Sequence, residues 1–124
     1  MQASELQGAA LDWAVALIEF PEPDYEDDDR LVYVHGDDEF HFTPSTDWAQ
    51  GGPIIEREGI CSGKYFNGPN QPFWIARLSY CIRCPDGNGL SFCYRKGPTP
   101  LIAAMRCYVA SKLGEEINIP EELK

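Results

Sequence analysis

The chain has 124 residues, 44% hydrophobic and 12% aromatic, which suits one globular domain over residues 1–124 and excludes a disordered chain. Its formal net charge of −10 at pH 7 is uneven, because the first 58 residues hold fifteen acids and two bases and the rest hold five acids and eight bases. Since an acidic surface repels phosphate, this charge argues against general binding to nucleic acid or anionic membranes, but it leaves room for a basic patch in the second half.

The first residues lack the features of a targeting or membrane segment. The stretch "MQASELQGAALDWAV" contains no lysine or arginine, and Asp12 and Glu19 interrupt the apolar residues around it. We therefore expect neither a signal peptide nor a membrane span. Five cysteines, an odd number, in a chain without a secretion signal indicate reduced thiols in a cytoplasm and no structural disulfides.

A first helix is predicted over about residues 4–19. Ser4 followed by Gln7 is a capping-box pattern, and Pro21 and Pro23 end the helix. The apolar residues at helical spacing are Leu6, Ala10, Trp13, Ala14 and Leu17. Further apolar residues lie between them, so we expect this helix to be covered on more than one side.

An acidic segment and a pair of short strands follow. Residues 21–29 contain six acids, which repel one another and predict an acidic surface loop over about residues 21–30. A calcium loop is not predicted, because Asp29 and His35 replace the glycine and glutamate that an EF-hand requires. The stretch "RLVYVHGDDEFHF", residues 30–42, predicts a strand, a turn and a short second strand.

A hairpin is predicted over residues 73–95. Alternating apolar residues place one side of each strand on the core, and a three-residue turn at 86–88 keeps both apolar sets on the same face. This register places Cys81 opposite Cys93. It also gathers four basic residues as a patch on the outer face: Arg77, Arg83, Arg95 and Lys96.

The last helix has explicit end signals. Thr99 is a suitable N-cap, Pro100 fits the first helical position, and Gly114 fits the residue that ends the helix. A line of small residues, Ala103, Cys107 and Ala110, lets another backbone approach closely. The C-terminal tail, residues 115–124, is expected to lie along the surface with Ile117 and Ile119 held against the core.

These elements predict an α+β fold. It consists of a small antiparallel sheet with an N-terminal and a C-terminal helix packed on one face.

Three segments resemble the phage NinX-like family of small proteins from lambdoid phages and prophages. They are "LQGAALDWAVALIE" (6–19), "PSTDWAQGGPIIEREGI" (44–60) and "GPTPLIAAMRCYVASKLGEEINIPEEL" (97–123). The resemblance is collinear along the chain and strongest in the last quarter. It implies a phage or prophage source and the host bacterial cytoplasm as compartment. The family brings no known reaction and no catalytic residues, so the resemblance implies none for this chain.

The stretch "TDWAQGGPIIEREGI", residues 46–60, predicts a chain reversal. Gly51 and Gly52 permit a tight turn, and the two isoleucines after Pro53 anchor the chain to the core. In the favoured interpretation Trp48 fills the space between the helices and the sheet. In the alternative a recognition loop presents side chains to a partner. Its candidate residues are Asp47, Trp48, Gln50, Glu56 and Arg57.

Arg106 lies among apolar neighbours at helical spacing, so it requires an acceptor that offsets its desolvation. We expect a buried ion pair with Asp12, although Asp47 is a second possible partner. The alternative is an arginine that binds a ligand.

No metal site or cofactor is predicted. Cys81 and Cys84 have CxxC spacing, but the pair follows a strand rather than opening a helix, and a zinc site would also need Cys61 and Cys93 from other segments. His35 and His41 flank a turn that contains three carboxylates, Asp37, Asp38 and Glu39.

The favoured function is a non-catalytic protein–protein interaction module that engages an unknown host or phage protein, as a monomer or homodimer. No serine-hydrolase, P-loop or zinc-protease motif is present. One alternative is a small metal-dependent or ligand-binding enzyme that uses His35, His41 and the nearby carboxylates. Another is weak nucleic-acid binding through Arg77, Arg83 and Arg95.

Overall fold

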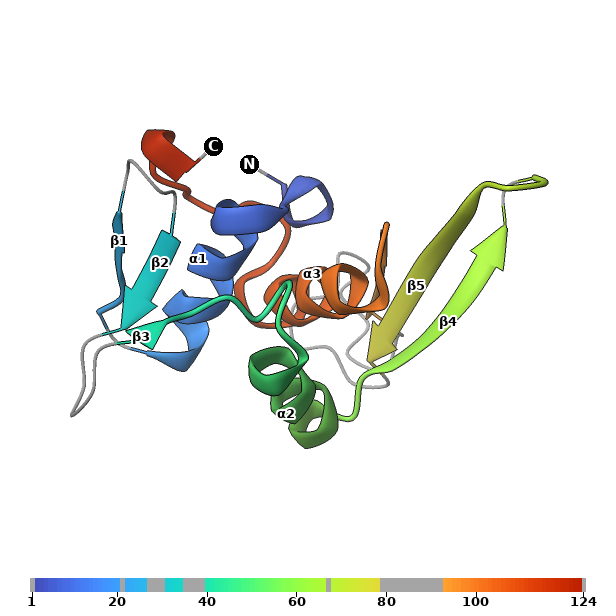
Figure 1. Ribbon diagram of the computed structural model, residues 1–124, viewed down its shortest axis with the longest axis horizontal. Coiled ribbons are helices and arrows are strands. Elements are labelled where there is room, and N and C mark those ends of the chain that lie inside the picture. The colour runs from blue at the N-terminus through green and yellow to red at the C-terminus, as the bar shows by residue number, and fades with distance from the viewer. Residues whose placement is uncertain are drawn as a thin grey trace.

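The computed structural model describes residues 2–20, 22–26, 31–34, 40–66, 68–78 and 93–123. In chain order the elements are η1 (Ala3–Glu5), α1 (Gly8–Glu19), β1 (Asp24–Glu26), β2 (Leu31–Val34), β3 (Phe40–His41), α2 (Trp48–Glu58), β4 (Cys61–Phe66), β5 (Pro72–Leu78), β6 (Cys93–Gly97), α3 (Pro100–Leu113) and η2 (Glu121–Leu123). The α+β class is confirmed, but the strands form two antiparallel three-stranded sheets, β1-β2-β3 and β4-β5-β6, rather than one. The helices lie between the two sheets (Figure 1).

Helix α3 is the centre of the fold and has the ends that the sequence predicts. Thr99 Oγ1 accepts a hydrogen bond from the Ile102 N–H at 3.1 Å, Pro100 opens the helix and Gly114 follows it. α3 contacts α1, α2 and all three strands of the β4-β5-β6 sheet. At Ala103, the first of the predicted line of small residues, another backbone does approach closely, since a Cβ on Gly97 would lie 2.7 Å from the Ala103 nitrogen. Glycine at the end of β6 therefore lets the sheet approach α3 closely.

Helix α1 begins later than predicted, and the capping box does not form. Gln7 precedes the helix without a side-chain capping bond. Ser4 lies in η1, and its N–H and hydroxyl both donate to Glu115 Oε1, at 3.2 and 2.9 Å. The prediction failed because Ser4 has a distant acceptor in the C-terminal segment, which a local pattern cannot include. The predicted apolar face is also wrong at one position, since Leu17 is 39% exposed.

Helix α1 packs against α3 and also against the β1-β2-β3 sheet. The first strand of this sheet lies where the sequence predicted an acidic loop, so that prediction is wrong there. Asp24–Glu26 is a strand paired with Leu31–Tyr33, although Pro21 and residues 27–30 lie outside the described part of the chain. Tyr25 explains this, because its ring meets Trp13 of α1 edge-on at 5.4 Å and its hydroxyl donates to Glu122. One aromatic side chain thus fixes an otherwise acidic segment to the core.

The β4-β5-β6 sheet has a different register from the predicted hairpin. Leu78 lies opposite Cys93, whereas the prediction placed Cys81 there; Cys81 itself lies outside the described residues. The predicted apolar face of β5 is confirmed, since Ala76 and Leu78 are buried. The difference of three residues is odd, so it moves every residue of β6 to the opposite face from the one predicted.

The C-terminal tail is fixed along its length. Ile117 and Ile119 are buried as expected, and Leu123 is buried as well. A β-bridge joins Gln2 to Glu116, and the Ala3 N–H donates to the Glu115 carbonyl at 2.7 Å. The N-terminal segment and the start of the C-terminal tail therefore lie side by side. None of the helices in the described ranges is both long and apolar enough to cross a membrane.

Candidate functional site

The stretch 46–60 forms helix α2, so the predicted chain reversal is wrong. Asp47 caps the helix by accepting a hydrogen bond from the Ala49 N–H at 2.9 Å. At the other end Gly59 has a φ of 68°, and the Ile60 N–H donates to the Ile55 carbonyl at 3.0 Å. This is the Schellman arrangement that commonly ends a helix, here with Ile60 buried beyond it.

The two glycines of α2 have different roles. A Cβ on Gly51 would collide with the Pro44 carbonyl oxygen and would lie 2.5 Å from Leu101 Cδ1. Gly51 is therefore needed where α2 crosses α3. A Cβ on Gly52 would meet only the Trp48 ring, at 3.9 Å. The pair of glycines reflects close helix packing rather than a turn.

Trp48 is displayed to solvent. Trp48 is the first residue of α2 and is 55% exposed. The favoured interpretation, that Trp48 fills the space between the helices and the sheet, is therefore wrong. The core side of α2 is formed instead by Gly51 and Ile54, which are buried. A large apolar ring is thus held outward on a helix whose opposite side is fixed.

Gln50 anchors the start of α2 rather than facing a partner. Its Oε1 accepts from the Thr43 N–H at 2.6 Å, and its Nε2 donates to the His41 carbonyl at 3.0 Å. Both partners belong to the segment around β3. The side chain therefore joins α2 to the β1-β2-β3 sheet and fixes the backbone next to Trp48.

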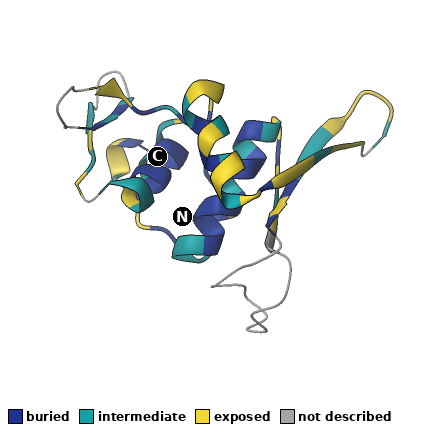
Figure 2. Cartoon of the chain, turned by 90° about the horizontal axis from the view of Figure 1, so that it is seen from below, coloured by how far each residue is buried: buried dark blue, intermediate teal, exposed yellow. Residues whose placement is uncertain are grey.

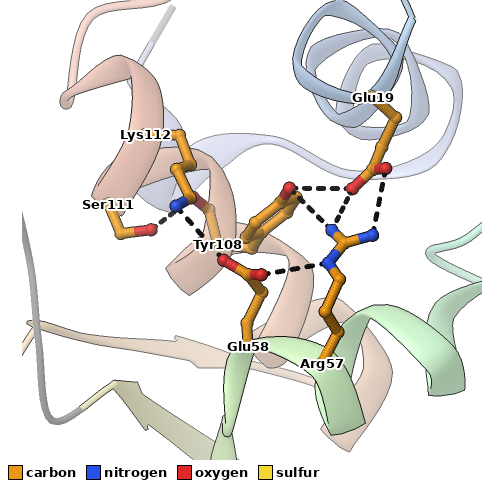
Figure 3. Close-up of polar contacts among 6 residues, drawn as sticks. All are labelled: Glu19, Arg57, Glu58, Tyr108, Ser111 and Lys112. Carbon is orange, nitrogen blue, oxygen red and sulfur yellow. Dashed lines mark hydrogen bonds and ion pairs between the residues drawn. The ribbon is translucent and has the colours of Figure 1, made fainter.

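Arg57 lies in an ion network that joins the three helices (Figure 3). Its guanidinium donates to the Glu19 carboxylate at the end of α1, to the Tyr108 hydroxyl of α3 at 3.0 Å, and to Glu58 Oε2 at 3.0 Å. The Tyr108 hydroxyl donates to Glu19 Oε1 at 2.7 Å, and Lys112 Nζ lies 3.2 Å from Glu58 Oε1. Sequence patterns missed this network, because its members come from three separate helix ends.

Two members of the network, Tyr108 and Glu58, have pKa values that are moved away from neutral pH. Burial and the hydrogen bond to Glu19 raise the pKa of Tyr108, so this hydroxyl remains protonated. Burial alone would raise the pKa of Glu58, but hydrogen bonds from Arg57 and Lys112 outweigh it and hold the pKa below its ordinary value. The cluster is a charged clamp between helices, and Arg57 positions α2.

The predicted ion pair between Asp12 and Arg106 does not form. Asp12 Oδ1 accepts from the buried Ser45 N–H at 2.9 Å. Arg106 donates to two backbone carbonyls, those of Leu6 at 2.6 Å and Lys96 at 2.8 Å. The acceptor that Arg106 requires is therefore backbone, which a search for acidic side chains cannot find.

Asp12 is a buried carboxyl group that forms no ion pair with a cation in the described ranges. Burial raises the pKa of Asp12 to about 6, and the hydrogen bond from Ser45 opposes this rise only in part. Arg106 shows the corresponding effect on a cation, since burial lowers its pKa. Both groups bind parts of the fold, Asp12 from a buried position and Arg106 from a half-buried one.

The residues proposed for metal chemistry are only partly described. His41 is exposed on β3, with its ring 6.4 Å from that of Tyr33, while His35, Cys81 and Cys84 lie outside the described residues. Among the positions that the structure describes, no three of the His, Cys, Asp and Glu side chains form a group that could hold a metal ion.

The predicted arginine patch is divided by the strand register. Arg77 pairs with Tyr94 and is exposed, whereas Arg95 pairs with buried Ala76 and points to the other face. Arg95 is neutralised there by Glu115, whose Oε2 lies 2.6 Å from its Nη2. Arg83 lies outside the described ranges. Arg77 and Arg95 therefore cannot bind one ligand as the sequence suggested.

Comparison with known proteins identifies the family. No curated protein matches the chain. The family model described as "Bacteriophage P22, NinX" matches residues 2–112, which include the helices α1, α2 and nearly all of α3. The match therefore covers most of the sequence, including helix α2 with Trp48. The chain belongs to the bacteriophage P22 NinX family.

Proposed function

We propose that this phage protein is a non-catalytic interaction module that binds a host or phage protein in the bacterial cytoplasm. The observation that carries the proposal is the exposure of Trp48, 55% in solvent on an anchored helix. Tryptophan is frequent among the residues that dominate binding energy at protein interfaces. The cytoplasm is proposed from the phage family and the odd number of cysteines.

The way α2 is held supports binding by Trp48 at low entropic cost. Asp47 and Gln50 fix the backbone on either side of the ring, and Arg57 fixes the far end of the helix. Burial of the exposed part of an indole is worth about 2 to 3 kcal/mol at ~25 cal/mol per Å². A surface ordered before binding retains more of this free energy.

The chemistry of α2 indicates what the partner offers. Ala49 and Pro53 are exposed on the same helix, and the nearby charged residue Glu56 is exposed too. A matching surface has an apolar pocket for the indole, with basic residues at its rim that complement the acidic first half of the chain.

The test is a pull-down from host lysate, with and without infection, using wild-type protein and the variant Trp48→Ala. We expect the variant to lose its partner, at a cost of roughly 2 kcal/mol or more, while its melting temperature stays within a few degrees of wild type. Tyr94→Ala is the matched control, because Tyr94 is an aromatic residue with a similar exposure, 56%, and it lies on the β4-β5-β6 sheet rather than on α2. Partner retention by Trp48→Ala, or loss of the partner in both variants, contradicts the proposal.

A further inference from the structure

The β4-β5-β6 sheet has two unlike faces. The inner face includes buried Ala76 and Leu78 and packs on α3. On the outer face the register brings together Cys61, Gly63, Tyr65, Phe73, Ile75, Arg77, Tyr94 and Lys96. Most side chains of this outer face are exposed, namely Cys61, Tyr65, Arg77, Tyr94 and Lys96, and β4 and β5 extend away from the helices (Figures 1 and 2).

Aromatic rings cover much of this outer face. Tyr65 and Phe73 lie directly opposite each other and stack, with ring centroids 5.9 Å apart at 29°. Tyr94 is 56% exposed on β6, and Tyr65 is 41% exposed. Flat rings open to solvent on a sheet form a platform on which planar ligands stack.

The same face is basic within an acidic protein. Arg77 lies opposite Tyr94 and is exposed, and the Lys96 Nζ lies 5.3 Å from the centre of the Phe73 ring. Neither cation forms an ion pair with the residues that the structure describes. The three strands, with six, seven and five residues, contain no aspartate or glutamate, although the chain as a whole has a net charge of −10.

We propose that this outer face binds single-stranded DNA. Bases stack on the exposed rings of Tyr65 and Tyr94, with Phe73 supporting the Tyr65 ring from its side, while Arg77 and Lys96 pair with phosphates. Duplex DNA does not fit, because its base faces are covered by their neighbours. RNA is not favoured, because no carboxylate or amide side chain on this face accepts a hydrogen bond from a 2′-hydroxyl.

The site is separate from the surface proposed for protein binding. Trp48 lies on α2, whereas the outer face belongs to β4, β5 and β6. The negative charge elsewhere repels DNA from the rest of the molecule, so binding is confined to this face and is sensitive to salt. The negative charge of the whole chain therefore weakens DNA binding, while the positive charge of this face favours it.

The experiment measures fluorescence anisotropy of a labelled oligothymidylate, about 12 nucleotides long to span one small binding site, at increasing salt. With two phosphate contacts, log K should fall against log salt with a slope of about −1.4. The matched duplex and the matched oligouridylate should bind more weakly. Absence of binding at low salt, equal binding of the duplex, or tighter binding of the RNA overturns the proposal.

Variants distinguish stacking from charge. Tyr94→Ala should weaken binding roughly tenfold, whereas Tyr94→Phe, which keeps the ring, should bind like wild type. Lys96→Gln should reduce the salt slope by about 0.7. Its control, Lys112→Gln, removes the same charge from α3 and should leave the slope unchanged. Circular dichroism verifies that each variant is folded.

The Trp48→Ala variant separates the two proposals. It should bind the oligonucleotide like wild type while it loses its protein partner, and Tyr94→Ala should do the reverse. If both variants lose DNA binding, or if neither does, the assignment of the DNA site to this sheet is wrong.

Discussion

At the scale of single residues, Asp12 makes stability depend on pH in the opposite sense to most carboxylates. The pKa of Asp12 is raised from 3.8 to about 6 in the folded protein because the carboxyl group is buried. The folded state therefore holds more protons than the unfolded state between these values. Ionised Asp12 destabilises the protein above pH 6, and this penalty is lost as the pH falls from 6 towards 4.

The variant Asp12→Asn tests this effect, since its amide oxygen can still accept from the Ser45 N–H. The difference in unfolding free energy between variant and wild type should shrink by about 2 to 2.5 kcal/mol between pH 8 and pH 4, because a shift of about two pKa units corresponds to ~3 kcal/mol and part of that change lies below pH 4. Urea unfolding at several pH values measures it. Glu56→Gln, at an exposed position, corrects for the loss of one negative charge. If this difference did not change with pH, folding would not raise the pKa of Asp12, and the effect of its burial would be contradicted.

At the scale of elements, α2 forms against the preferences of its own residues. Gly51, Gly52 and Pro53 all disfavour a helix interior, and Pro53 removes one backbone hydrogen bond. The helix persists because the Asp47 cap and the burial of Ile54 hold it to the fold. Tertiary contacts therefore determine this element.

The two adjacent glycines make a matched pair for testing this packing. Gly51→Ala should lower the unfolding free energy by roughly 1 to 3 kcal/mol, because the new methyl group meets the Pro44 carbonyl and the Leu101 side chain. Gly52→Ala should raise it by up to about 1 kcal/mol, because the site has room and alanine favours the helix. Thermal or urea melting measures both. Equal effects of the two changes would contradict the close approach of α2 and α3.

Which elements the sequence could predict depends on whether their signals are local. α3 was predicted with both ends, because Thr99, Pro100 and Gly114 act within one helical turn. α2 was missed because Leu101, the residue that makes Gly51 necessary, is fifty positions away. The predicted register of β5 and β6 differs from the observed one by three residues. Because three is odd, Arg95 was assigned to the wrong face of the sheet. The exposure of Trp48 likewise depends on tertiary packing.

At the scale of the whole molecule, charge and hydrophobic contacts are distributed by region. The acidic first half includes the Trp48 helix, and the second half provides the basic aromatic sheet. The C-terminal tail connects distant parts, since Glu115 binds both Ser4 and Arg95. Loss of contacts in the tail should therefore weaken the fold as a unit rather than only at one end.

Ile117→Ala tests the role of the tail. It should lower the unfolding free energy by about 2 to 5 kcal/mol, because Ile117 is 4% exposed and a cavity remains in its place. The adjacent Asn118→Ala is the control, since Asn118 is exposed and should change stability by less than about 0.5 kcal/mol. Urea unfolding followed by tryptophan fluorescence compares them. Similar stability of both variants would mean that the tail is dispensable.

The pairing of Gln2 with Glu116 has a consequence for synthesis on the ribosome. Translation releases the N-terminal residues first, yet the Ala3 N–H meets the Glu115 carbonyl only after nearly the whole chain has been made. η1 also packs on β6 and α3, so these contacts too come from residues made late in synthesis. A chain that lacks the tail from Glu115 onward would keep the contacts of η1 with α3 and β6 but lose the bridge to the tail, so its first segment would be held less firmly and would be more open to proteases.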